Sequence, residues 1–136
     1  MIGFVVELMG PAMFGALTVF ALFGLLFAVT TEFRRRYDRT SADERAERLL
    51  QSKLTPDEYG QLLIQGYMKI PSPSRADRYY LVPRQRGFVR VYDAGRQVMR
   101  LCVGPKEWVP DADVVLMHKL MIEGDETEYL RTAIVW

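Results

Sequence analysis

The feature that most constrains this chain is an uncharged stretch near its start. No Asp, Glu, Lys or Arg occurs between Leu8 and Thr31, and Arg34, Arg35 and Arg36 follow almost at once. As an α-helix this stretch would be about 35 Å long, and the hydrocarbon core of a bilayer is about 30 Å thick. The sequence therefore predicts a single transmembrane helix.

A cleaved signal peptide and a buried core helix are the two alternatives for this stretch. A signal peptide has basic residues before a shorter apolar segment, whereas all 18 Lys and Arg of this chain lie at or after Arg34. A buried helix of this composition needs a large protein around it, and 136 residues are too few to supply one. Both alternatives fit the sequence less well than a retained transmembrane helix.

The distribution of basic residues predicts the orientation of this helix. Cytoplasmic flanks of membrane helices carry an excess of Lys and Arg, and here only the C-terminal flank does. The expected anchors at this interface are aromatic or basic, and they are Phe33, Arg34, Arg35, Arg36, Tyr37 and Arg39. We therefore expect a single-pass protein with its N-terminus outside and its C-terminal domain in the cytoplasm. The chain has 14 Arg but only 4 Lys, a bias associated with GC-rich bacterial genomes, which favours the bacterial inner membrane.

Small residues recur along the predicted span at a spacing of four. The pairs are Ala12 with Ala16 and Gly24 with Ala28. Residues four apart lie on the same side of a helix, and small side chains there let a second helix approach closely. These positions are candidate contacts with transmembrane helices of other subunits. Membrane helices are rich in small residues in any case, so contact with lipid alone stays open.

The chain after the arginines divides into a linker and a domain. We assign residues 1–40 to the transmembrane helix with its arginine edge, 41–54 to an amphipathic linker helix and 55–136 to a small cytoplasmic domain. In the linker, Ser41 and Glu44 have the spacing of a capping box. No Pro or Gly separates the linker from the first helix, so the two can be continuous. We expect the linker to be solvated.

The domain begins with the clearest helix start of the chain. Thr55 is placed to be the N-cap, Pro56 the first helical residue and Glu58 the partner that closes a capping box. Tyr67 falls on the apolar stripe of this helix, Gly66 is placed to end it, and Pro71 prevents its continuation. The sequence therefore predicts one short helix between these limits.

Three runs rich in Tyr, Val, Phe and Leu follow this helix and read as strands. They are RYYLVPR (78–84), GFVRVYD (87–93) and RQVMRLCV (96–103). Two helices should close the chain, one starting at Pro110 and a short one restarting after Gly124. The expected fold class is α+β: a single N-terminal transmembrane helix and a small domain in which a three-stranded antiparallel meander packs with helices. The strand register stays open.

Charge is segregated within the domain. Residues 69–106 hold nine basic residues against two acids, whereas residues 107–136 hold seven acids against two basic residues. The sheet should therefore be basic and the C-terminal helices acidic. The candidate binding patch consists of Arg84, Arg86, Arg90 and Arg100. The two layers can neutralise each other, or the patch can bind an acidic protein or anionic lipid headgroups. No nucleic-acid-binding signature occurs, so nucleic acid is not an expected partner.

The residues that carry most enzyme chemistry are scarce. The chain has one cysteine, Cys102, and one histidine, His118. Cys102 lies in a strand-like run and is expected to be a buried small hydrophobe, and His118 a core or interface residue. The two share no metal-ligand spacing, and a Cys–His nucleophile pair would lack a third group to orient it. No glycine motif for phosphates, dinucleotides or acyl transfer occurs, so we expect no catalytic residue, metal or cofactor.

Two functions are consistent with these observations. The first is a non-catalytic accessory subunit, structural or for assembly, of a larger bacterial membrane complex such as a respiratory or photosynthetic electron-transfer complex. The second is an independent membrane-tethered adaptor whose basic sheet recruits a soluble acidic partner. Neither is an enzyme. We expect the first, because the chain combines a lone span, small-residue positions and few reactive groups.

Overall fold

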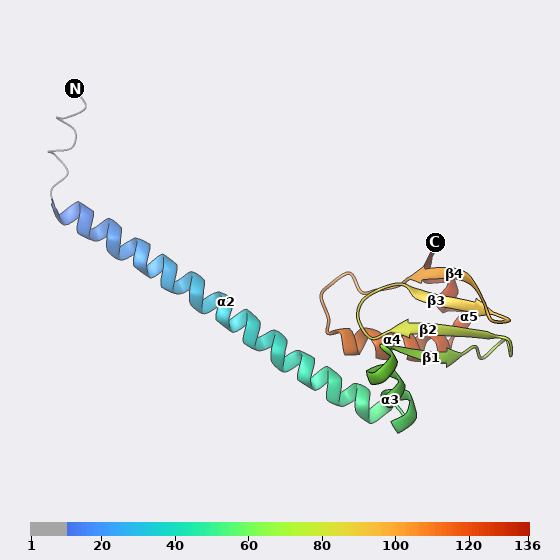
Figure 1. Ribbon diagram of the computed structural model, residues 1–136. Coiled ribbons are helices and arrows are strands. Elements are labelled where there is room, and N and C mark those ends of the chain that lie inside the picture. The colour runs from blue at the N-terminus through green and yellow to red at the C-terminus, as the bar shows by residue number, and fades with distance from the viewer. Residues whose placement is uncertain (1–10) are drawn as a thin grey trace. The chain divides into compact units, whose positions relative to one another are not determined.

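A computed structural model describes the chain from Pro11 to Trp136, with side chains from Thr18 onward, as an α+β fold (Figure 1). The described elements are α2 (Pro11–Lys53), α3 (Pro56–Gln65), β1 (Tyr67–Pro71), β2 (Arg78–Pro83), β3 (Val89–Asp93), β4 (Arg96–Cys102), α4 (Asp111–Gly124), α5 (Glu126–Thr132) and β5 (Ile134–Val135). The chain forms two compact units that divide between Thr40 and Ser41.

The first unit is the N-terminal part of α2. Its side chains from Thr18 to Thr30 are all exposed, including the large apolar ones. Within the part of the chain that the structure describes, none of the helices combines the length and apolar content needed to cross a membrane. The span expected from the sequence starts at Leu8, outside the described residues, and Ala12 and Ala16 lie where no side chains are described.

The second unit begins with the C-terminal part of α2. Ala46 and Leu50 are buried on one side of this helix, with exposed fractions of 5% and 1%, and Leu54 follows them into the core. We expected residues 41–54 to be a solvated linker. The structure instead makes them part of the domain, because their apolar stripe packs against the other elements of the second unit.

Helix α3 starts as the sequence predicts. The Thr55 side chain accepts a hydrogen bond from the Glu58 amide and the Glu58 carboxylate accepts one from the Thr55 amide, with Pro56 at the first position. The helix ends at Gly66, whose φ of 75° closes it in the left-handed conformation. Placing Tyr67 on the stripe of this helix was wrong, because Tyr67 already begins β1.

The sheet is an antiparallel meander with strand order β1-β2-β3-β4-β5. The three predicted strands correspond to β2, β3 and β4, and a two-residue turn with positive φ at Ala94 and Gly95 joins the last two. The expected number of three strands was too low, since the described sheet has five. On one edge β1 pairs with β2, and on the other Ile134 and Val135 pair with the end of β4.

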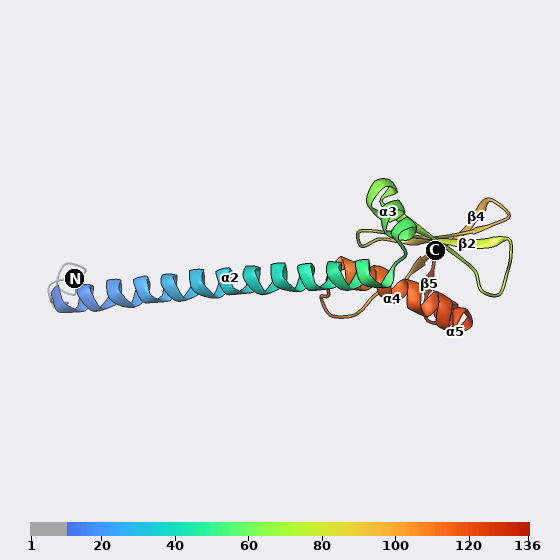
Figure 2. The ribbon, with the colours of Figure 1, turned by 90° about the horizontal axis from the view of Figure 1, so that it is seen from below.

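Helices α4 and α5 cover one face of this sheet (Figure 2). Alternate strand residues point toward them and are fully buried, among them Met68, Tyr80, Val82, Val91 and Leu101. Helix α3 lies along the β1 edge, where the Gln61 side chain accepts a hydrogen bond from the backbone amide of Lys69. The opposite face of the sheet is consequently the one whose side chains reach solvent.

Candidate functional site

The face of the sheet that points away from α4 and α5 is the candidate interaction surface, and we call it the outer face. The strand register aligns one residue from each strand in a row across it. This row is Lys69, Leu81, Arg90 and Arg100. Trp136 extends the row, because two backbone hydrogen bonds pair it with Arg100. Strands lie about 4.8 Å apart, so the row is about 19 Å long.

Aromatic rings hold the cations of this row in place. Lys69 Nζ lies 4.2 Å from the centre of the Tyr79 ring, and Tyr79 in turn stacks on Tyr92 with ring centres 5.0 Å apart. The Arg90 guanidinium lies 5.9 Å from the Tyr67 ring, as a cation–π contact. The rings of Tyr79 and Tyr67 therefore restrict two charged side chains that would otherwise be free to rotate.

Arg100 belongs to the second aromatic cluster of this face. Its guanidinium lies 5.3 Å from the centre of the Phe88 ring, and Phe88 meets Trp136 edge to face. Both rings are largely solvent-exposed, Phe88 by 44% and Trp136 by 68%. The outer face thus combines fixed cations with exposed aromatic surface at one side.

Among the residues that the structure describes, no acid neutralises the positive charge of the outer face. Among the described residues, Lys69, Arg90 and Arg100 form no ion pair, and no strand residue that points to this face is Asp or Glu. Arg90 and Arg100 are direct cross-strand partners, an arrangement of like charges that destabilises a sheet. An anion placed on this face would offset that repulsion.

Only two of the four arginines of the expected patch lie on the outer face. Arg84 Nη2 lies 3.2 Å from Glu47 Oε1, and Arg86 Nε lies 3.2 Å from Asp111 Oδ1, with a second Arg86 nitrogen donating to the Val109 carbonyl. Arg84 and Arg86 thus serve the internal complementarity that the sequence left open. Lys69, which sequence reasoning did not include, takes their place.

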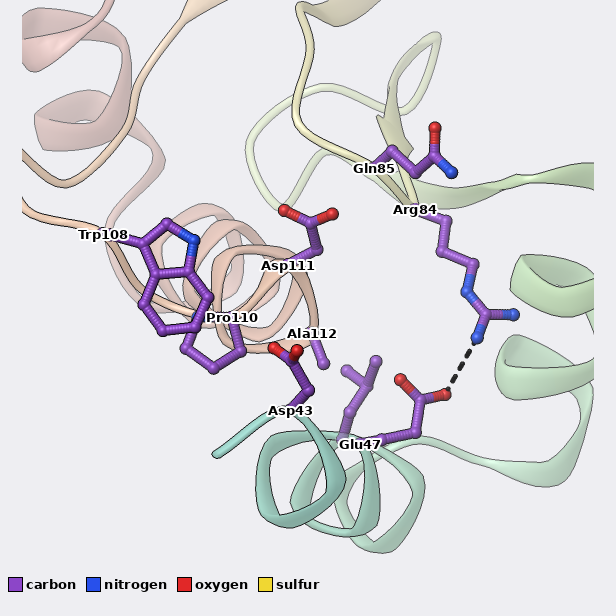
Figure 3. A pocket seen from close by; sticks show the side chains of 9 residues that line it. Asp43, Glu47, Arg84, Gln85, Trp108, Pro110, Asp111 and Ala112 are labelled. Carbon is purple, nitrogen blue, oxygen red and sulfur yellow. Dashed lines mark hydrogen bonds and ion pairs between the residues drawn. The ribbon is translucent and has the colours of Figure 1, made fainter. Parts of the chain in front are cut away.

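Arg84 lines a pocket of about 410 Å³ (Figure 3). Its walls come from the C-terminal part of α2, the loop after β2 and the start of α4, and its polar lining is Asp43, Glu47, Arg84, Gln85 and Asp111, with Trp108 at one side. Glu47 accepts hydrogen bonds from Tyr59 Oη at 2.7 Å and from Arg84. These two hydrogen bonds account for the position of the Glu47 carboxylate, and no acid–base role is needed to explain it.

A buried polar network lies between the sheet and α5. Glu126 accepts hydrogen bonds from Tyr80 Oη, from Ser72 Oγ at 2.7 Å and from the amide and hydroxyl of Ser74. Burial raises the pKa of the Glu126 carboxyl, but the hydrogen bonds from Ser74, Tyr80 and Ser72 outweigh it and leave that pKa below its ordinary value. Burial, followed by the Glu126 hydrogen bond, raises the pKa of the Tyr80 hydroxyl.

His118 lies in a second buried polar contact. It is 2% exposed, and its Nδ1 lies 2.9 Å from Tyr129 Oη. Burial without a charged partner lowers the pKa of His118 to about 4, so its ring is neutral at pH 7. Burial also raises the pKa of the Tyr129 hydroxyl. His118 is therefore a core residue whose ring has a hydrogen-bond partner in Tyr129.

Cys102 differs from the expectation drawn from the sequence. It is exposed, not buried. Side chains alternate along β4, and Leu101 points into the core, so the next residue, Cys102, points to the outer face. In the described residues, no three His, Cys, Asp or Glu side chains are placed to hold one metal ion.

The expected membrane-interface anchors lie on α2. Phe33 and Tyr37 are 73% and 70% exposed, and Arg35 lies 3.8 Å from Glu32 as a surface ion pair. Arg34, Arg36 and Arg39 are exposed on the same helix. Of the expected small-residue contacts, Gly24 and Ala28 lie on described, exposed helix, and a Cβ added at Gly24 would meet no atom within 4 Å. The described part of the chain therefore leaves the space at Gly24 open.

Comparison with known proteins gives no relative from which a function could be transferred. No family model, no curated protein and no solved structure matches this chain.

Proposed function

We propose that this protein is a membrane-anchored, non-catalytic accessory subunit of a larger bacterial membrane complex, such as a respiratory or photosynthetic electron-transfer complex. The observation that carries the proposal is the exposed apolar surface of α2. Its members are Val19, Phe20, Leu22, Phe23, Leu25, Leu26, Phe27 and Val29, each at least 58% exposed. They belong to the uncharged stretch Leu8–Thr31, which we propose as the membrane span.

This apolar surface runs around the whole helix. Successive residues of an α-helix turn by about 100°, so Leu25, Leu26 and Phe27 alone point in three different directions. A helix that is apolar all round is stable only in an apolar environment. Lipid or the helices of other subunits supply that environment in our proposal.

Two features favour a subunit over a solitary anchor. Gly24 and Ala28 form a small-residue site that lets another helix approach closely. The described part of the domain shows no group of side chains arranged for catalysis. Its buried carboxylate, Glu126, is hydrogen-bonded to Tyr80, and its buried histidine, His118, to Tyr129. A protein with such a helix and such a domain is suited to holding other subunits together.

The proposed topology places the N-terminus outside and the domain in the cytoplasm. Cys102 is exposed and is the single cysteine of the chain, so it reports the side of the membrane on which the domain lies. We expect a membrane-impermeant maleimide to label Cys102 in inverted inner-membrane vesicles and not in right-side-out vesicles. Labelling from the outside would contradict the cytoplasmic assignment.

Substitution Gly24→Leu is expected to loosen association with the complex. A Cβ at this position would meet no described atom of this chain within 4 Å, and Leu has a higher helix propensity than Gly, so folding and insertion should be preserved. A neighbouring helix packed on Gly24 would be pushed away. After extraction in mild detergent, the wild type should migrate with a large assembly on native gels. The ratio of released to bound chain should be at least about tenfold higher for the variant, which corresponds to a loss of about 1.4 kcal/mol in binding free energy.

The matched control for this experiment is Leu26→Phe. It adds bulk about 200° away on the same helix and keeps the apolar character of an exposed position. It should leave migration with the assembly unchanged. Release of the wild-type chain as a monomer in mild detergent would contradict the subunit proposal and favour the independent adaptor.

A further inference from the structure

We propose that the outer face of the sheet docks the domain onto the anionic headgroups of the membrane that holds α2. The inference rests on the proposed membrane anchor and adds a second attachment to it. The ligand chemistry is that of phosphate-bearing headgroups such as phosphatidylglycerol.

The charge of the outer face fits an anionic surface. Lys69, Arg90 and Arg100 lie in one row, without ion pairs among the described residues. Each Lys or Arg near an anionic leaflet is attracted by about 1 kcal/mol, which is a factor of about five in the docking equilibrium. The acids of α4 and α5 lie on the other side of the sheet, so the domain has opposite charge on its two faces.

The arginines are arranged for binding phosphate. Arg90 and Arg100 are direct cross-strand partners, and each guanidinium is held by an aromatic ring, Tyr67 or Phe88. A guanidinium restricted in this way keeps its N–H edge free for a phosphate oxygen and loses little rotamer freedom on binding. Two such groups on neighbouring strands suit the charge of a headgroup phosphate.

The aromatic residues of this face are of the kinds that favour the membrane interface. Trp and Tyr are enriched at headgroup level, where an amphipathic ring contacts both lipid and water. Trp136 and Phe88 are exposed together beside Arg100. Leu81 lies between Lys69 and Arg90 in the row, and none of the strand residues that point to this face is Asp or Glu.

The tether between the span and the domain is short. Arg39 is the last expected interface residue, and Ala46, seven residues later, is already in the core of the domain. Seven residues span at most about 25 Å even when the chain is fully extended. The headgroups are therefore present at high effective concentration, and weak contacts are enough to keep the domain docked.

Nucleic acid fits this face less well. Tyr79 and Tyr92 are stacked on each other with an angle of 2° between their planes, and Lys69 lies over the Tyr79 ring. The Tyr79 ring is therefore occupied by Tyr92 and Lys69 and does not offer a free face on which a base could stack. An acidic protein remains a distinct occupant, and the experiment separates it from lipid.

Protection of Cys102 from a maleimide tests the proposal with the full-length protein. Cys102 is exposed at the edge of the outer face, and its labelling rate should fall when the face is docked. In nanodiscs containing phosphatidylglycerol, labelling should be at least about fivefold slower than in nanodiscs of phosphatidylcholine alone. About 0.5 M NaCl, where the Debye length is only about 4 Å, should remove most of this difference.

Two double variants with equal charge change provide the control. The variant R90Q/R100Q removes the paired cations of the outer face and should reduce the lipid-dependent difference below about twofold. The variant R48Q/R131Q removes two cations from exposed helix positions elsewhere, with side chains 68% and 71% exposed, and should behave as wild type. Equal labelling in both lipids would overturn the inference, as would protection that persists in R90Q/R100Q.

The remaining outcomes separate this inference from the proposed function. Co-elution with the nanodisc reports the anchor independently of Cys102. A chain that does not enter the nanodisc would overturn both proposals, whereas an inserted chain with a lipid-independent labelling rate overturns only the docking. If Cys102 is free in anionic nanodiscs but protected in native membranes, the outer face binds a protein of the complex, and the lipid proposal is wrong.

Discussion

Acidification from pH 7 to pH 4 is expected to lower the free energy of unfolding of the domain by about 3 kcal/mol through His118 alone. In the folded chain burial holds the pKa of His118 at about 4, against an ordinary value of 6.5. Above pH 6.5 the ring is neutral in both states. Between pH 6.5 and 4 only the unfolded chain binds the proton, so stability falls as the pH falls.

Urea unfolding in mild detergent, followed by far-UV circular dichroism across this pH range, measures the effect. The control is His118→Gln, in which an amide oxygen can still accept the Tyr129 hydroxyl and no group titrates. This variant should lose most of the pH dependence above pH 4.5. The contribution of Glu126, whose folded pKa lies below the ordinary 4.5, is lost only at lower pH. An unchanged slope in His118→Gln would show that another group is responsible.

Replacement of Leu50 by Ala is expected to destabilise the domain by about 2–5 kcal/mol. Leu50 is 1% exposed and lies in the core together with Ala46 and Leu54. Truncation leaves a cavity in this core and removes the apolar contacts that Leu50 makes there. The same urea titration gives the change in free energy.

Leu49→Ala is the matched control, because the preceding residue on the same helix is 45% exposed. It makes the same chemical change but removes little buried surface, so we expect a loss below about 1 kcal/mol. Similar losses for the two variants would mean that the C-terminal part of α2 does not belong to the core. The residues 41–54 would then be the solvated linker that the sequence suggested.

Local signals predicted most of the domain. The capping box at Thr55 and Glu58, the αL glycine at Gly66 and the acidic start of α5 each act within a few residues, and each occurs as the sequence indicates. The three predicted strands also form, because their alternating apolar residues pack on one face. Such signals need no knowledge of the rest of the fold.

The first and last strands, β1 and β5, were harder to predict from the sequence. Tyr67 continues the apolar spacing of α3, so β1 resembled the end of a helix, although Met68 and Ile70 alternate with exposed Lys69 as a strand does. That alternation was the signal that could have placed Lys69 on the outer face. Strand β5 has only two residues, and its pairing with β4 depends on the tertiary fold.

The partners of the basic residues also required the fold. Arg84, Arg86 and Arg90 have equal charge and similar spacing in the sequence, but the first two meet Glu47 and Asp111, which lie 37 and 25 residues away. Sequence composition indicated that the sheet is basic. It could not indicate which cations are neutralised and which remain available.

The Glu126 network has a consequence for how the chain folds. It joins Ser72 and Tyr80 to a carboxylate 54 and 46 residues later, so it cannot form until nearly the whole domain has been brought together. Contacts of such long sequence separation slow folding. Until α4 and α5 dock, the face of the sheet that they cover, with Val82 and Val91, stays exposed. Intermediates of this kind are prone to aggregate, so docking of the C-terminal helices α4 and α5 ends the exposure of the sheet during folding.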